Sequence, residues 1–112
     1  LIKQAREKKI NLIFVSQATM WKPDLEKKYE DLIITSGFAN NEAFYSTKVL
    51  YEGMEVFNEQ LKMVCKRNNI SYIDLNLPKN TDSFYDDFHF NESGAELTSD
   101  QIAEFLKIKE LN

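Results

Sequence analysis

The residues best suited to chemistry are Asp86 and His89, and His89 is the only histidine of the chain. A neutral imidazole titrates near physiological pH and can take a proton from a hydroxyl group. Its other nitrogen needs a partner that holds the ring and stabilises the imidazolium that forms. A carboxylate three residues earlier can fold back to do this across a turn. Asp86 has this spacing, whereas Asp87 is adjacent in sequence and its geometry makes it a poorer partner.

Two other interpretations of this pair are open. His89 can be a surface histidine near a helix start with incidental aspartates, because such pairs are common in proteins. It can also bind a metal ion together with Asp86 and Asp87. The metal interpretation is weaker, since one histidine and no further histidine or cysteine nearby leave no convincing set for zinc or another transition metal. We therefore expect no metal and no cofactor.

The hydrophobic pattern predicts an α/β architecture that carries this pair in a loop. Residues 10–15 and 70–75 are rich in apolar and β-branched side chains, as expected of strands in a parallel sheet. The helix predicted between them, over 42–67, has one apolar face made of Leu50, Met54, Phe57, Leu61 and Val64. Ligands of such sheets bind beyond the carboxyl ends of the strands. The loops 16–21 and 76–91 should therefore open on the same edge.

Helical patterns also occupy both ends of the chain. Residues 1–9 read as the end of an amphipathic helix, and because they start within helical text we expect a piece of a longer polypeptide. The last helix is predicted over 93–107, with Ser93 and Glu96 at capping-box spacing. The central helix should end at Asn68-Asn69, because Asn tolerates the left-handed cap conformation.

The connection over residues 16–40 has no clear period, although Pro23 and the pairs Ser36-Gly37 and Asn40-Asn41 indicate turns. Long connections inside a compact domain are often functional. Gln17, Met20 and Trp21 are therefore candidates for a lid or a substrate-lining wall. The alternative is a decorated connection whose large side chains only fill the core, and the sequence does not separate the two.

Composition limits the class of protein. The chain has 112 residues, 43% of them hydrophobic and 29% charged, with a net charge of -4, as in ordinary soluble domains. The lack of a basic stripe argues against nucleic acid as a partner. No apolar run approaches the roughly 20 residues that span a bilayer, so no transmembrane segment is predicted. Cys65 is alone, which excludes a disulfide framework within the chain and, given its apolar neighbours, predicts a buried structural thiol.

The stretch Tyr85-Asp86-Asp87-Phe88-His89-Phe90-Asn91-Glu92-Ser93-Gly94-Ala95 resembles the last conserved block of the SGNH, or GDSL-type, esterase and lipase family. That block has an Asp-x-x-His, then polar residues and a Gly that opens the final helix. Residues 12–17 are similar to the family's penultimate core strand, 57–61 to its N-x-x-L helix, and 70–75 to the strand before the triad loop. The resemblance covers nearly the whole chain, but only the C-terminal half of the family's domain.

The resemblance implies a flavodoxin-like three-layer α/β/α sandwich with a parallel sheet, of which residues 1–112 are the C-terminal part. It implies a serine esterase that hydrolyses carboxylic esters of small molecules, lipids or carbohydrates. Asp86 would orient His89, and His89 would act as general base and then as general acid. The family's Gly-Asp-Ser motif and oxyanion blocks are not found, since Gly37-Phe38-Ala39-Asn40 is not Gly-x-Asn-Asp. The nucleophile would then come from sequence upstream of Leu1.

Half of such a sheet should expose apolar edges, so we expect association with the missing half or self-association. A second hypothesis of another class is a non-catalytic α/β binding or interaction module that retains an Asp-x-x-His. A strand followed by Gly-Asp-Ser in the upstream sequence would favour the enzyme.

Overall fold

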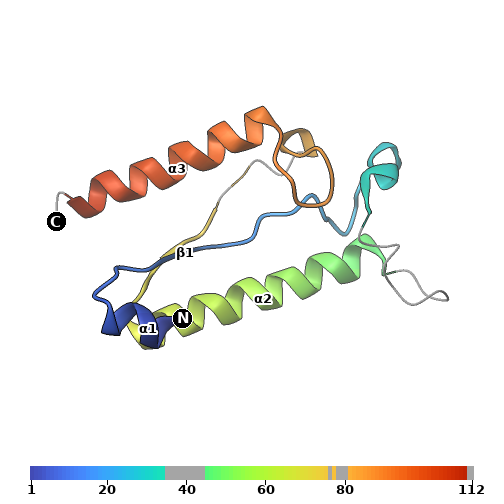
Figure 1. Cartoon of the computed structure of the whole chain (residues 1–112). Helices are drawn as coiled ribbons and strands as arrows, with labels where there is room; N and C mark the ends of the chain where they lie inside the picture. Colours follow the sequence, from blue (N-terminus) through green and yellow to red (C-terminus); the bar gives the residue numbers. More distant parts are fainter. Residues whose placement is uncertain (35–44, 76, 78–80, 111–112) are drawn as a thin grey trace.

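The computed structural model describes residues 1–34, 45–75, 77 and 81–110. Its elements, in chain order, are helix α1 (Ile2–Glu7), strand β1 (Ile13–Val15), 3-10 helix η1 (Lys27–Leu32), helix α2 (Thr47–Asn68), strand β2 (Ser71–Ile73), 3-10 helix η3 (Thr81–Ser83) and helix α3 (Glu92–Glu110). Figure 1 shows the two strands running between the long helices α2 and α3. The predicted turns at 36–37 and 40–41, and the first residues of the helix predicted from 42, lie outside the described residues.

The strands β1 and β2 pair in parallel, with Phe14 opposite Tyr72. The predicted α/β class is confirmed at this level: helices and strands alternate around a two-stranded parallel sheet. Both strands are shorter than the predicted ranges because other bonds replace the ladder at their ends. The N–H of Ile10 donates to the carbonyl of Ala5 at the end of α1. The N–H of Leu75 donates to the Ser16 hydroxyl at 2.8 Å.

Helix α2 begins and ends with polar caps. The Ser46 hydroxyl accepts a hydrogen bond from the N–H of Val49 at 3.3 Å, which satisfies one donor that the first turn leaves unpaired. At the other end, Asn69 adopts the left-handed conformation, with φ 53° and ψ 45°. The predicted asparagine stop is therefore confirmed, and it works because Asn tolerates this region better than most residues.

The predicted apolar face of α2 is only partly covered. Leu50, Met54 and Leu61 are half-buried, but Phe57 and Val64 are exposed, so the prediction is wrong for these two. A sheet of two strands is too narrow to cover the whole stripe. It covers the side of α2 that carries Cys65, which is buried as predicted, and burial raises the pKa of this thiol.

The main apolar cluster lies beyond the carboxyl ends of the strands. Met20, Trp21, Ile33 and Phe84 form it, and half-buried side chains from the first turns of α2 pack against it. These residues come from the connection after β1 and from the loop before α3. The core therefore fastens the loops that surround the predicted site.

Helix α3 is capped by Asn91 and not by the predicted capping box. The Asn91 side-chain oxygen accepts a hydrogen bond from the N–H of Gly94 at 3.0 Å, and the helix begins at Glu92. Ser93 and Glu96 therefore lie inside the helix, where both are exposed. The prediction was wrong because Asn91 is an equally good cap and stands two residues earlier.

Many large apolar side chains are exposed, as expected for an incompletely covered sheet and its helices. The Cα radius of gyration is 16.4 Å, compared with about 13 Å for a compact domain of this size. Among the described residues, no helix combines the length and hydrophobicity needed to cross a membrane.

Two glycines should respond in opposite ways to alanine. A Cβ at Gly94 would collide with the carbonyl oxygen of Ser83, so Gly94→Ala should lower the free energy of unfolding by about 1–3 kcal/mol. A Cβ at Gly53 would meet nothing within 4 Å, so no close neighbour requires this glycine. Gly53→Ala should therefore raise the free energy of unfolding by up to about 1 kcal/mol through helix propensity. Urea unfolding followed by circular dichroism checks both, and a stable Gly94→Ala protein would contradict the packing described.

Candidate functional site

Asp86 and His89 are joined by a tight turn. The Oδ1 atom of Asp86 accepts hydrogen bonds from the backbone N–H groups of Phe88 and His89 at 3.1 and 3.0 Å. Such turns are typical of aspartate, whose short side chain reaches the backbone two and three residues ahead. The same carboxylate lies 2.8 Å (Oδ2) and 3.0 Å (Oδ1) from Nδ1 of His89. The structure therefore brings together the two residues that the sequence predicted as a pair.

The imidazole of His89 faces solvent while its carboxylate partner is more protected. The side chain of His89 is 64% exposed and that of Asp86 is 25% exposed. With Nδ1 donating to the carboxylate, Nε2 is the unprotonated nitrogen that can accept a proton. Among the described residues, none forms a hydrogen bond with Nε2. The bond to His89 and the two backbone bonds hold the pKa of Asp86 below its usual range, so its charge faces the imidazole at neutral pH.

Aromatic residues flank the pair unequally. The Phe88 ring lies 4.6 Å from the imidazole between centroids, at an interplanar angle of 47°. The Phe90 ring instead packs on Phe84, at 5.2 Å between centroids. Phe88 therefore lies against the imidazole, whereas Phe90 belongs to the packing around Phe84.

Backbone bonds close the loop that carries the pair. The N–H of Tyr85 donates to the carbonyl of His89 at 2.8 Å, and Phe84 and Phe90 form an isolated antiparallel bridge. At the base of the loop, the side-chain amide of Asn91 donates to the carbonyl of Asp82 at 2.6 Å. The ends of the loop are thus fixed independently of the Asp86–His89 contact.

Asp87 has a different role from its neighbour. Its side chain is 0% exposed, and its Oδ1 atom accepts a hydrogen bond from the N–H of Ile34 at 2.7 Å. Its backbone carbonyl accepts another from the N–H of Met20 at 2.8 Å. Asp87 therefore attaches the loop to the connection that follows β1, while Asp86 serves His89. Within the part of the chain that the structure describes, no group of three or more His, Cys, Asp or Glu residues could hold a metal ion.

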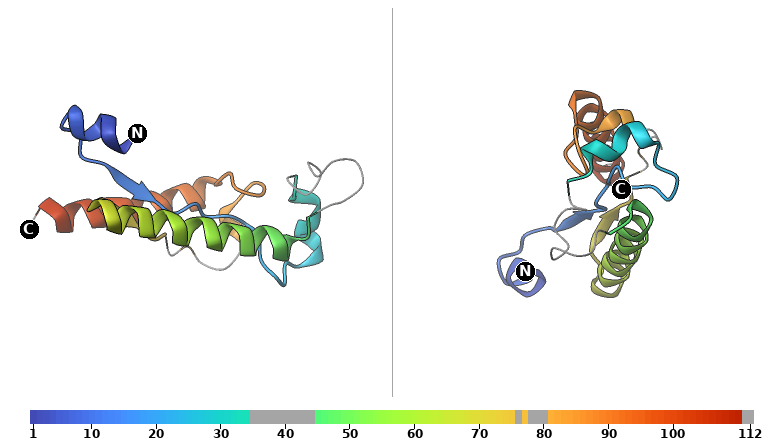
Figure 2. Two further views of the ribbon diagram at one scale, coloured as in Figure 1. Left: turned by 90° about the horizontal axis from the view of Figure 1, so that it is seen from below. Right: turned by 90° about the vertical axis from the view of Figure 1, so that its right-hand side faces the viewer.

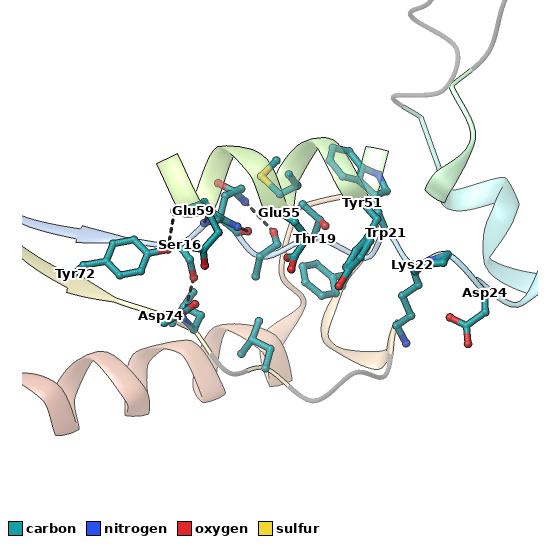
Figure 3. A pocket seen from close by; sticks show the side chains of 18 residues that line it. Ser16, Thr19, Trp21, Lys22, Asp24, Tyr51, Glu55, Glu59, Tyr72 and Asp74 are labelled. Atoms are coloured by element: carbon teal, nitrogen blue, oxygen red, sulfur yellow. Dashed lines mark hydrogen bonds between the residues drawn. The ribbon is translucent and has the colours of Figure 1, made fainter. Parts of the chain in front are cut away.

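A pocket of about 550 Å³ opens at the carboxyl ends of the two strands. Its walls come from the loop after β1, the inner face of α2, the end of β2 and Phe84. Figure 3 shows Ser16 and Tyr72 at the strand ends, with Glu55 and Glu59 contributed by α2. The pocket therefore lies where ligands of parallel sheets bind. Neither Asp86 nor His89 lines it.

The three residues of the first loop that were predicted to line a substrate site lie in different surroundings. Gln17 and Trp21 line the pocket. Met20 is 1% exposed and belongs to the core cluster instead. Trp21 is part of both the cluster and the pocket wall, so this loop both fills the core and lines the pocket.

Two residues that shape the pocket were not predicted as site residues. The side-chain amide of Asn58 both accepts from the N–H and donates to the carbonyl of Gln17, each at 2.9 Å, as a neighbouring strand would. The Ser16 hydroxyl accepts from the N–H of Leu75 and so ties the ends of both strands together. The signal for Asn58 was available: it is a polar residue on the face of α2 that carries Met54, Leu61 and Cys65.

We compared the chain with protein-family models, with curated proteins and with solved structures, and found no match. The functional argument therefore depends on the geometry described above.

Two substitutions of Asp86 should weaken the turn to different degrees. Asp86→Ala removes the acceptor of two backbone N–H groups and of the imidazole, and should lower the free energy of unfolding by about 1–2 kcal/mol. Asp86→Asn keeps the Oδ1 acceptor and should cost less. The pKa of Asp86 is lowered in the folded protein, so its charge contributes stability that is fully present above the unfolded pKa of about 3.9. That contribution is lost as the pH falls through the lowered folded value.

Urea titrations between neutral pH and about pH 2 check this expectation. The difference in stability between wild type and Asp86→Asn should shrink toward the acid end of this range. Asp100→Asn, on the exposed side of α3, is the matched control and should show little difference at any pH. A difference for Asp86→Asn that is constant down to the acid limit would contradict the assigned interaction.

Asp87→Ala should be more destabilising than Asp86→Ala. It removes a fully buried carboxylate and leaves the part-buried N–H of Ile34 without this acceptor, at a cost of about 2–3 kcal/mol. Thermal or urea unfolding of the two alanine variants side by side measures the order. An Asp87→Ala protein as stable as wild type would show that the carboxylate does not hold this loop.

Proposed function

We propose that this chain supplies the aspartate and histidine of the catalytic triad of an SGNH-type serine esterase that hydrolyses carboxylic esters. One observation carries the proposal: the Asp86 carboxylate holds Nδ1 of His89 at 2.8 Å and leaves the other side of an exposed ring toward solvent. A catalytic histidine needs both features, an oriented tautomer and access to the hydroxyl that it deprotonates.

In the proposed reaction, Nε2 of His89 takes the proton of a serine hydroxyl as the serine oxygen attacks the ester carbonyl. The tetrahedral intermediate collapses when the protonated imidazole gives that proton to the leaving alcohol. Water then attacks the acyl-enzyme with the same histidine as base, which releases the acid and regenerates the serine. Throughout, Asp86 stays ionised, orients the ring and stabilises the imidazolium charge.

The serine and the oxyanion donors of this proposal come from polypeptide outside residues 1–112. Two features support such an additional part. Each strand has only one partner among the described residues, so each presents an unpaired edge that could accept further strands. Exposed apolar side chains are numerous on the helices. Further parallel strands and helices would complete a three-layer α/β/α sandwich, of which residues 1–112 form the C-terminal part.

The proposed substrates are esters of small molecules, lipids or carbohydrates. The pocket at the strand ends offers them both apolar and hydrogen-bonding surface, through residues such as Trp21, Tyr51, Gln17 and Thr19. The loop after β1, which lines this pocket, is joined to the loop of His89 by a hydrogen bond from the N–H of Met20 to the carbonyl of Asp87. The pocket and the loop of His89 therefore lie at the same end of the sheet.

One observation favours the rival proposal of a non-catalytic binding module. The pocket is lined without Asp86 or His89, so it could bind a ligand without their participation. Under this proposal the Asp86–His89 contact only stabilises the loop. The two proposals differ in whether a serine is activated, which a covalent probe detects directly.

The esterase proposal is tested with a fluorophosphonate probe and a p-nitrophenyl ester on the complete polypeptide that contains this chain. His89→Ala should abolish labelling and lower kcat/KM on the order of 10⁶-fold, as expected for loss of a triad histidine. Asp86→Asn should lower kcat/KM strongly while keeping the fold, because Oδ1 still accepts the backbone bonds.

Two controls separate chemistry from stability. Asp100→Asn should be labelled as wild type is. Asp87→Asn shows how much labelling is lost when the loop is perturbed at a residue that does not bind the imidazole. Undiminished labelling of His89→Ala would exclude the role proposed for His89. A wild-type protein that binds ligands in the pocket but never reacts with the probe would favour the binding module.

A further inference from the structure

One residue, Asp87, binds both ends of the segment 20–34. Its backbone carbonyl accepts a hydrogen bond from the N–H of Met20 at 2.8 Å, and its Oδ1 atom accepts another from the N–H of Ile34 at 2.7 Å. A surface loop whose ends meet in this way is an Ω loop, and we use this name for the segment. Asp87 itself belongs to residues 82–90, which we call the histidine loop. The closure of one loop therefore depends on a residue of the other.

Side chains between these two ends hold the Ω loop against the histidine loop. Trp21 and Ile33, each next to one end, belong to the apolar cluster that contains Phe84 of the histidine loop. The Tyr29 hydroxyl donates a hydrogen bond to Oδ1 of Asp82 at 3.2 Å. Figure 1 and the left view of Figure 2 show η1, which contains Tyr29, at the same end of the described chain as the loop before α3. The two loops therefore pack as one unit.

The Ω loop is also a wall of the pocket. Trp21, Lys22, Pro23 and Asp24 line the pocket, and Figure 3 shows Trp21, Lys22 and Asp24 on the side away from Tyr72 and the strands. None of the residues of η1 is buried, so this part of the Ω loop adds little packing of its own. The place of the wall therefore depends mainly on the contacts that close the Ω loop.

The buried side chain of Asp87 fixes this closure. It is 0% exposed, so bulk water does not compete for its hydrogen bond with the N–H of Ile34. A buried polar group is costly unless it is hydrogen-bonded, which favours the closed loop over any arrangement in which Ile34 has moved away. The turn of the catalytic pair does not need this bond, since Asp86 makes its own with the N–H groups of Phe88 and His89. Asp87 can therefore be altered while the imidazole keeps its partner.

We propose that Asp87 is a positioning residue, which holds the pocket wall of the Ω loop in a fixed place relative to His89. This role rests on the proposed function, in which the pocket takes the ester and His89 activates the serine. The reacting bond must lie within reach of that serine, and a misplacement of about 1 Å can cost on the order of 10²-fold in rate. Asp87 acts through the wall that the substrate contacts, and Asp86 acts on the imidazole.

The first test follows amide hydrogen exchange of the complete polypeptide by NMR. Asp87→Ala removes the acceptor of the Ile34 N–H but keeps the backbone carbonyl that binds Met20. If the carboxylate closes the whole Ω loop, the Met20 amide should still exchange about tenfold faster than in wild type. The amide of Leu61, in the middle of α2, corrects for any change in global stability.

Asp87→Asn keeps one oxygen that can accept the Ile34 N–H, so the Met20 amide of this variant should exchange at a rate between those of wild type and Asp87→Ala. Asp100→Asn is the matched control and should exchange as wild type does. Faster exchange at Ile34 alone would overturn the proposal, because the carboxylate would then hold only its own partner and not the Ω loop.

The second test compares two esters on the complete polypeptide. The acyl chain of p-nitrophenyl octanoate can fill the pocket, whereas that of p-nitrophenyl acetate cannot. Asp87→Ala should lower kcat/KM for the octanoate about tenfold more than for the acetate, mainly through a higher KM, because the wall binds the substrate and not its reacting bond. A smaller amount of folded protein would lower both values equally, so the ratio separates positioning from stability. Asp100→Asn should keep the wild-type ratio.

The positioning role and the esterase proposal fail in different ways. A wild-type protein that cleaves both esters, with an unchanged ratio in Asp87→Ala, would overturn the positioning role alone. A wild-type protein that cleaves neither ester would overturn the esterase proposal and, with it, the positioning role.

Discussion

The site depends on one carboxylate that binds two kinds of partner at once. Asp86 accepts the backbone N–H groups of the turn and also holds the imidazole of His89. The ring orientation is therefore set by the same carboxylate that holds the backbone of the turn. The side-chain bond with His89, together with the backbone bonds, favours the charged form, so the pKa of Asp86 is lowered and its charge stays beside the imidazole.

Side chains, more than sheet ladders, hold the loops around this turn. A two-stranded sheet supplies few backbone bonds, so polar side chains take their place at the strand ends. Asn58 binds the backbone of Gln17, Ser16 binds the N–H of Leu75, and Asp87 binds the N–H of Ile34. Each joins segments that are distant in sequence. Together with the apolar cluster of Met20, Trp21, Ile33 and Phe84, they hold the loops at the end of the sheet.

Helix α2 has more apolar surface than the two-stranded sheet can cover. The inner face of α2 packs on β2 and lines the pocket, while the outer face, with Val56 and Phe57, is exposed. The unpaired strand edges follow from the small number of strands. Any larger assembly, within one polypeptide or between copies, would gain free energy by covering them.

The sequence by itself determined the local features. Apolar runs and helical spacing located both strands and the three helices, and the Asp-x-x-His spacing predicted the Asp86–His89 contact, because a turn of this length depends only on nearby residues. The asparagine stop of α2 was predicted for the same reason. The α3 cap was misplaced because two equally good caps stand close together.

Only the tertiary structure decided which surfaces are covered. The sequence could not show that Met20 belongs to the core while Gln17 and Trp21 line the pocket, nor that Phe57 and Val64 are exposed, since the pattern of an apolar stripe is the same whether or not a neighbour covers it. It also could not assign Asp87 to the Ile34 backbone or Asn58 to Gln17. These contacts join residues far apart in the chain, and their geometry exists only once the strands, α2 and the loops have packed together.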